Sequence, residues 1–111
     1  MIEKIVLDWL TANMIVPVYA EKPEVEPESY LVVNKTGSSV SNHIYSATIT
    51  VQSYAPSKFE AAELNELVKT AMDAIVALTA VSRCQLNSDY SYPDTSTKSY
   101  RYQAVFDLVH Y

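Results

Sequence analysis

Apolar and polar residues follow two different periods along this chain, and each period predicts a different kind of element. Over residues 2–10 apolar side chains recur every three or four positions, which is the spacing of one face of a helix. Residues 57–78 repeat that spacing over a longer stretch, and Ser57 with Glu60 fits the capping box that begins a helix. The stripe that we expect this longer helix to turn toward the core is Leu64, Leu67, Val68, Ala71, Met72, Ile75 and Leu78.

A period of two predicts the strands. Residues 44–54 alternate between apolar and polar side chains, and β-branched residues are frequent among them. At about 3.3 Å per residue this strand would run about 35 Å, roughly twice the usual length, so it could project beyond the rest of the domain. The other predicted strands are residues 30–35, 81–86 and 100–111, with a short edge strand within residues 15–19.

Polar segments separate these elements. Residues 37–43 are small and polar, which favours a flexible hairpin loop. Residues 87–98 form a polar stretch that is long for so small a domain, and loops of that length tend to be functional or mobile. Residues 21–28 hold two prolines and four glutamates, which indicates an extended and solvated connector.

The order of these elements predicts the fold class. A chain of 111 residues forms one domain, residues 1–111. Strands joined by hairpins, with helices over one face, predict an α+β fold in two layers. We expect an antiparallel sheet packed on one long helix plus a short N-terminal helix. The strands and helices are not evenly interleaved, which argues against a doubly wound parallel sheet.

Composition narrows the function by exclusion. Gly37 is the only glycine, whereas phosphate-binding loops need several, so both the P-loop and the dinucleotide fingerprint are excluded. The net charge is −5 and the eight basic residues are scattered, which argues against sequence-specific nucleic-acid binding. Cys84 is the only cysteine, so no disulfide within the chain is possible, and we expect a small buried side chain there.

We expect a cytoplasmic protein without membrane spans. The first residues lack the basic and apolar regions of a signal peptide, and no apolar stretch approaches the ~20 residues that a spanning helix needs.

The chemistry-bearing residues do not form a recognised catalytic pattern. His43 and His110 lack the spacing of a metal-binding motif, and the serines lack the context of a nucleophile elbow. Asp89 and Asp94 could act as paired carboxylates, but a loop rich in Asp, Ser and Pro is more simply a series of turns. We therefore expect no enzyme, no cofactor and no metal.

Tyrosine is the unusual feature of the composition, since there are nine Tyr and only two Phe. Tyrosine suits surfaces that are wet in the free protein and buried on association. We expect Tyr45, Tyr100 and Tyr102 to pack the sheet. The remaining interface candidates among the tyrosines are Tyr90, Tyr92 and Tyr111.

Seven segments spread over nearly the whole chain carry a family resemblance. They are residues 1–10, 16–19, 43–47, 49–54, 59–65, 86–90 and 100–106. In these segments the chain resembles the small tail-completion proteins of siphophages that infect Gram-positive bacteria. The resemblance implies a tail terminator with an α+β sheet flanked by helices. Six copies would form a ring on the last ring of tail-tube protein, halt its polymerisation and present a surface to the head connector.

The resemblance also implies where the contacts lie. Long hairpins of that fold contribute to ring contacts and tube docking, which points to residues 35–44 and 89–98 here. The candidate interface residues are Gly37, Ser39, Val40, Asn42, His43, Tyr90, Tyr92, Asp94 and Tyr111. The expected partners are further copies of the chain, the tail-tube protein and the head–tail connector protein. The expected location is the virion tail, with DNA passing through an acidic ring without being bound.

Two other kinds of protein remain open at this point. One is a head–tail joining or minor capsid protein of similar size. The other is a cytoplasmic peptide-binding module that adds a partner strand to an exposed sheet edge. A small hydrolase is a third class, but the sequence offers it no recognised site.

Overall fold

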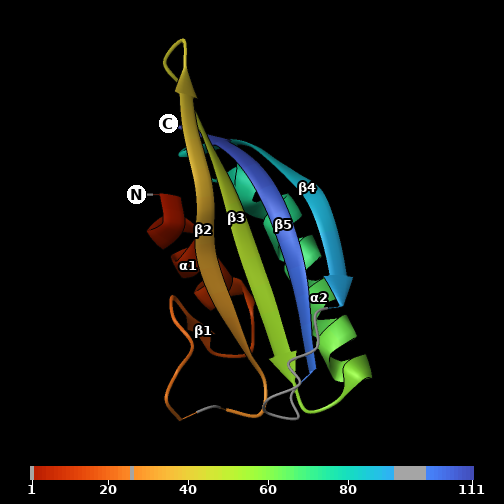
Figure 1. The fold of residues 1–111 in the computed structure, drawn as a ribbon. Helices are drawn as coiled ribbons and strands as arrows, with labels where there is room; N and C mark the ends of the chain where they lie inside the picture. Colours follow the sequence, from red (N-terminus) through yellow and green to blue (C-terminus); the bar gives the residue numbers. More distant parts are fainter. Residues whose placement is uncertain (1, 26, 92–99) are drawn as a thin grey trace.

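The computed structural model describes residues 2–25, 27–91 and 100–111, and it is an α+β fold with a sheet packed against a long helix. Figure 1 shows the strands in front and both helices behind them. The elements are α1 (Ile2–Asn13), β1 (Val18–Tyr19), β2 (Tyr30–Ser41), β3 (Ile44–Ala55), α2 (Lys58–Asp73), the short 3-10 helix η1 (Ala74–Ala77), β4 (Val81–Ser91) and β5 (Tyr100–His110). No helix in the described residues is long and apolar enough to cross a membrane.

The sheet is mixed, which corrects the expectation of a purely antiparallel one. Its strand order is β1-β2-β3-β5-β4, and every pair is antiparallel except β1 with β2. The segment between β1 and β2 is long enough to return the chain to the end where β1 began, so the two strands run in the same direction. Pro17 joins this edge through its carbonyl, which accepts a hydrogen bond from the Leu31 amide at 2.9 Å.

Two strands are longer than the sequence predicts. β2 continues to Ser41 and β4 to Ser91, although residues 37–43 and 87–98 read as loops. Backbone pairing with β3 and β5 extends them, because small polar side chains on water-facing strands do not oppose it. Bulges interrupt the alternation in both strands, which removes the period-two signal.

The core lies between the helices and one face of the sheet. Its fully buried side chains include Val6, Leu10, Leu31, Val33, Ile49, Val51, Val68, Met72, Ile75 and Ala104. The expectation for Leu67 is wrong, because its side chain is 52% exposed. At 100° per residue, Leu67 lies about 115° from the centre of the buried face of α2, and Asn65 occupies that face instead.

The capping box at the start of α2 is present in a modified form. The Ser57 hydroxyl accepts a hydrogen bond from the Glu60 amide at 3.2 Å, as the sequence predicts. The same hydroxyl donates to the Glu60 carboxylate at 3.0 Å, whereas the sequence suggested that Glu60 would reach the Ser57 amide.

A tyrosine cluster covers the open face of the sheet at the end opposite the hairpin turn. The rings of Tyr30 and Tyr54 stack with centroids 4.6 Å apart, and Tyr19 meets Tyr30 edge-on at 6.0 Å. Lys22 and Arg101 both lie over the Tyr54 ring. The tyrosines that pack the sheet are therefore Tyr30 and Tyr54. Of those expected to do so, Tyr45 is 46% and Tyr100 is 44% exposed, and Tyr102 is half-buried.

Candidate assembly interface

The β2–β3 hairpin extends beyond the helices that cover the rest of the sheet. The backbone amide of Lys35 donates a hydrogen bond to the Glu3 carboxylate at 2.8 Å, so the first turn of α1 lies against β2 at Lys35. β2 runs on for residues 36–41, which is about 20 Å of strand. Figure 1 shows this part of the hairpin projecting at the top, and we call residues 36–48 the arm. The projection contributes to the elongated shape of the molecule, 45 × 24 × 24 Å.

A two-residue turn closes the arm. Asn42 and His43 both have positive φ, 51° and 65°, as the central residues of a type I′ turn do. Such turns match the twist of the paired strands, which keeps the arm regular to its tip. Asn tolerates this conformation through its short polar side chain, whereas His43 is held there at some cost.

Three apolar side chains near the tip are exposed. They are Val40 at 63%, Ile44 at 53% and Tyr45 at 46%. Val40 pairs with Tyr45, and the alternation along β3 places Tyr45 on the same side of the sheet as Ala47. This is the side that the helices cover farther along the hairpin. The Tyr45 ring lies 5.9 Å from that of His110, and the arm carries no Lys, Arg, Asp or Glu.

The opposite, open face of the sheet carries rows of hydrogen-bonded polar side chains. Asp107 accepts from Thr48 at 3.2 Å and from Asn87 at 2.9 Å. Farther along, Gln103 accepts from Gln52 at 3.0 Å and donates to the Tyr90 hydroxyl at 2.6 Å. These bonds link β3, β5 and β4 side by side, so this face is polar and held in place.

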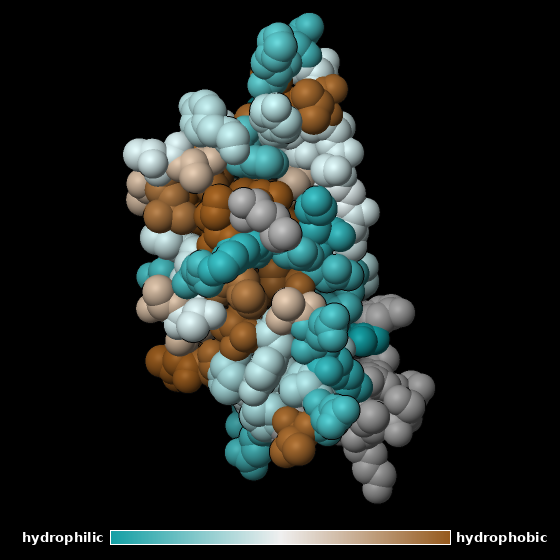
Figure 2. Space-filling model, turned by 90° about the vertical axis from the view of Figure 1, so that its left-hand side faces the viewer, coloured by the Kyte–Doolittle hydropathy of each residue, from teal (hydrophilic) through white to brown (hydrophobic). Residues whose placement is uncertain are grey.

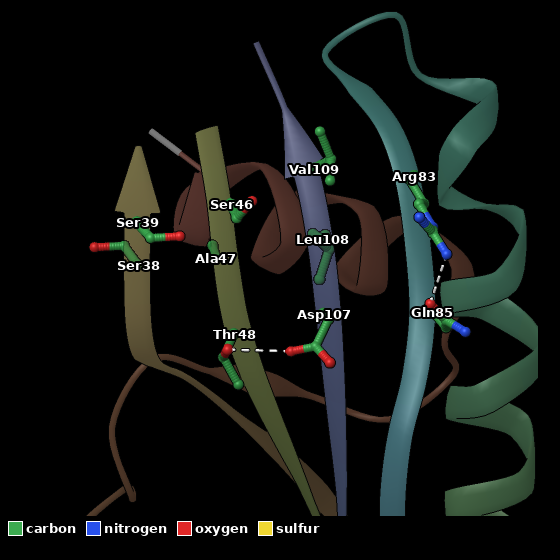
Figure 3. Close-up of a pocket in the computed structure, with 10 residues that line it drawn as sticks. All are labelled: Ser38, Ser39, Ser46, Ala47, Thr48, Arg83, Gln85, Asp107, Leu108 and Val109. Atoms are coloured by element: carbon green, nitrogen blue, oxygen red, sulfur yellow. Dashed lines mark hydrogen bonds between the residues drawn. The ribbon is translucent and has the colours of Figure 1, made fainter. Parts of the chain in front are cut away.

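A shallow hollow of about 340 Å³ lies on this open face and spans four strands (Figure 3). Ser38 and Ser39 of the arm line it on one side, and Arg83 and Gln85 of β4 line it on the other. Arg83 donates to Gln85 at 2.9 Å, and the hollow offers hydroxyl, amide and guanidinium groups together with the Asp107 carboxylate, which accepts from Thr48. Within the described part of the chain, no group of three His, Cys, Asp or Glu could hold a metal ion.

An ion pair and a half-buried thiol lie between α2 and β4. The Lys69 ammonium lies 2.7 Å from Glu66 and 3.0 Å from Asp89, and hydrogen bonds to these two carboxylates, Glu66 first, raise the pKa of Lys69. Asn65 also donates to Asp89 at 3.0 Å. Burial, with smaller effects of nearby carboxylates, raises the pKa of Cys84 to about 11. The thiol is therefore protonated at neutral pH and is a weak nucleophile.

An apolar groove runs along the outer side of α1. It is lined by Ile5, Asp8, Trp9, Ala12, Leu78, Thr79 and Ala80. The Trp9 indole donates to the Ala71 carbonyl at 2.8 Å, which fixes the ring, and Asp8 pairs with Lys4 at 2.9 Å. Figure 2 views the side of the molecule on which α1 lies and shows hydrophobic atoms gathered there between hydrophilic ones.

The structure brings most of the sequence-predicted interface residues together. The arm holds Gly37, Ser39, Val40, Asn42 and His43. Tyr111 lies at the same end of the sheet, where its amide donates to the Ala80 carbonyl at 3.0 Å, and its side chain is 81% exposed. Tyr90 lies apart from them, toward the other end of β4. Tyr92 and Asp94 lie outside the described residues.

Sequence reasoning did not identify Ile44 and Tyr45 as interface candidates. The alternation placed Tyr45 on a buried face, and only the position at which the helices end shows that this face is uncovered. Ile5 and Trp9 belong to the apolar helix face that the sequence predicts over residues 2–10, and both are half-buried and line the groove.

The comparisons with known proteins give a likeness of fold. No family model matches the sequence, and no curated protein matches it. Among solved structures, a chain from the virion of a native gene transfer agent particle is similar, with a TM-score of 0.56 and 12% sequence identity. The alignment covers 97% of this chain and 92% of that one. At this identity the likeness shows that the two chains share a fold over nearly their whole lengths.

Proposed function

We propose that this protein is a structural component of a phage-like virion. In this proposal it is a tail terminator, whose copies form a hexameric ring that caps the tail tube and joins it to the head connector. The observation that carries the proposal is the arm, because a projecting hairpin with exposed apolar residues and no Lys, Arg, Asp or Glu is suited to contact with another protein. The shared fold with a chain of a virion particle is the second support.

The open face supports the same proposal. A ring through which DNA moves must not hold the phosphates, and phosphates are held by clustered Lys and Arg. Arg83 and Arg101 lie on this face and donate to the neutral side chains of Gln85 and Tyr54, so each keeps its positive charge. Arg83 pairs with Val109 near one end of β5 and Arg101 lies at the other end, so the two arginines do not form a cluster, within a chain of net charge −5.

The native mass of the purified protein over a wide range of concentrations tests the proposal, together with electron microscopy of the assembled species. We expect a mass of six chains and ring-shaped particles. Binding to the end of tail tubes from the same virion is the second measurement, since some rings need their tube in order to form. A protein that stays monomeric and ignores tube ends would refute the proposal.

The free edge of β4 favours one alternative, a peptide-binding module. Among the described strands β4 pairs with β5 alone, so its outer edge offers backbone groups over Val81–Ser91 to an added strand. In that case the protein would remain monomeric, and hydrogen exchange of the β4 amides would slow when an extended peptide binds.

A further inference from the structure

We infer that the arm of one copy docks into the apolar groove beside α1 of a second copy. This inference rests on the self-assembly proposed above and names the two surfaces that meet. The groove consists of the seven residues from Ile5 to Ala80 given above, and the docking segment is the tip of the arm, where Val40 and Tyr45 lie on the helix-facing side.

The arm lacks a helix layer over one side of its strands. Farther along the same hairpin, Ile49 and Val51 are fully buried because helices cover that side of the sheet. Val40 and Tyr45 continue this side past Lys35, where the first turn of α1 lies, and they are exposed in the described structure. The arm therefore presents the helix-facing side of a sheet without a helix layer, and the outer surface of another copy's helix layer would complete it.

The groove of the second copy offers a rigid surface for the arm. The groove lies on the outer surface of the helix layer, where Trp9 is held by its bond to Ala71 and therefore offers a rigid aromatic wall. Rigid, partly buried Trp side chains are frequent among the residues that dominate interface energies. Ala12 is exposed and small, so it leaves room for an incoming side chain.

Few charged side chains lie on the two surfaces that would meet. Burying an unpaired charge would oppose docking, and neither surface requires it. The arm has no Lys, Arg, Asp or Glu. The charged residue of the groove is Asp8, which forms an exposed ion pair with Lys4 at 2.9 Å, so its charge has a partner at the groove.

The arm and the groove would give a head-to-tail contact between copies. Figure 1 shows the arm projecting away from α1, so a chain does not fill its own groove. The two surfaces are different patches of one molecule, which makes the contact head-to-tail, and such contacts close into rings when the rotation per copy permits it. A dimer with a two-fold axis would need each patch to meet itself.

Two surface substitutions test the contact. Val40→Asp places a charge on the arm, and Ala12→Glu places one in the groove; Val25→Asp is the matched control at a site that is 88% exposed and outside both surfaces. We expect each of the first two variants to weaken assembly at least about tenfold, as measured by light scattering over a concentration series, because a charge must then be buried without a partner. The control should assemble like the unmodified protein.

Mixing the two variants tests whether the arm of one copy contacts the groove of another. Val40→Asp keeps an intact groove and Ala12→Glu keeps an intact arm, so an equal mixture should yield 1:1 dimers although each variant alone is monomeric. Combining Val40→Lys with Ala12→Glu in one chain should restore assembly. Unchanged thermal melting of each variant verifies that it folds.

The outcomes separate this inference from the function on which it rests. If both variants still form the assembly of the unmodified protein, the docking is wrong and the ring proposal stands. If the mixture contains only monomers, the head-to-tail contact is wrong. If the unmodified protein never assembles, the proposed ring and this contact both fail.

Discussion

The two halves of the β2–β3 hairpin share the same strands and the same kind of pairing, but their environments differ. In one half Leu31, Val33 and Ile49 are fully buried under the helices. In the other half Val40 and Ile44 are more than half exposed, although the backbone ladder continues to Ser41↔Ile44. The comparison shows that strand pairing sets the path of the chain, whereas the helix layer determines where burial contributes to stability. The uncovered half is therefore free to serve assembly.

We expect the largest effect on the free energy of unfolding when alanine replaces a buried isoleucine of β3, compared with an exposed one. Ile49→Ala removes a fully buried side chain and should lower the free energy of unfolding by about 3 kcal/mol, because it leaves a cavity in the core. Ile44→Ala changes the same residue type in the arm, on the opposite face of the sheet, and it should cost less than about 1 kcal/mol. Urea denaturation measures both. Equal costs would show that the arm is covered in solution and would break the comparison.

The next effect separates folding from assembly. Replacing residues 40–45 by Asn-Gly closes the hairpin at the Ser39↔Ser46 pair with a favourable two-residue turn. We expect the free energy of unfolding to change by no more than about 1 kcal/mol, since the removed side chains are mostly exposed. Assembly, measured as native mass, should be lost. A shortened chain that fails to fold would mean that the arm supports the core.

The sequence predicts the elements of the core better than their limits. The strong periods of residues 44–54 and 57–78 identify β3 and the α2–η1 helix, and Ser57 marks where α2 begins. Leu67 was placed on the buried face because it continues a spacing of three and four. The true buried face follows Leu64 and Val68 and admits Asn65, whose amide bonds to Asp89 on β4. That partner is distant in sequence, so the local pattern does not reveal it.

The candidate interface is predictable in position but not in form. Small polar residues at 37–43 indicate a segment outside the core, and the structure places this segment in the arm. It is paired strand up to Ser41, because the bulge between Lys35 and Gly37 shifts the alternation without ending the ladder. Whether Tyr45 is buried depends on how far the helix layer extends along the sheet, which is set by tertiary packing and not by the local sequence. The groove depends equally on the packing of α1 against residues 78–80.

The smallest effect tests whether the two halves unfold together. His43→Gly removes a side chain from a left-handed backbone position, which stabilises the folded state by about 1 kcal/mol. Glycine also gives the unfolded chain more conformational freedom, and this offsets roughly half of that stabilisation or more. We expect a net gain of no more than about 0.5 kcal/mol. Asn42→Gly is the matched control and should gain less, because Asn already tolerates this conformation.

Hydrogen exchange at individual amides shows whether the two halves of the hairpin unfold separately or together. If the arm opens on its own, hydrogen exchange should slow at the amides near the tip, such as that of Tyr45, while exchange at Ile49 and the melting temperature stay unchanged. The reason is that local opening of an uncovered hairpin exposes no core. A rise in melting temperature with uniform slowing at both positions would instead show one cooperative unit. The arm would then carry stability as well as the proposed contacts.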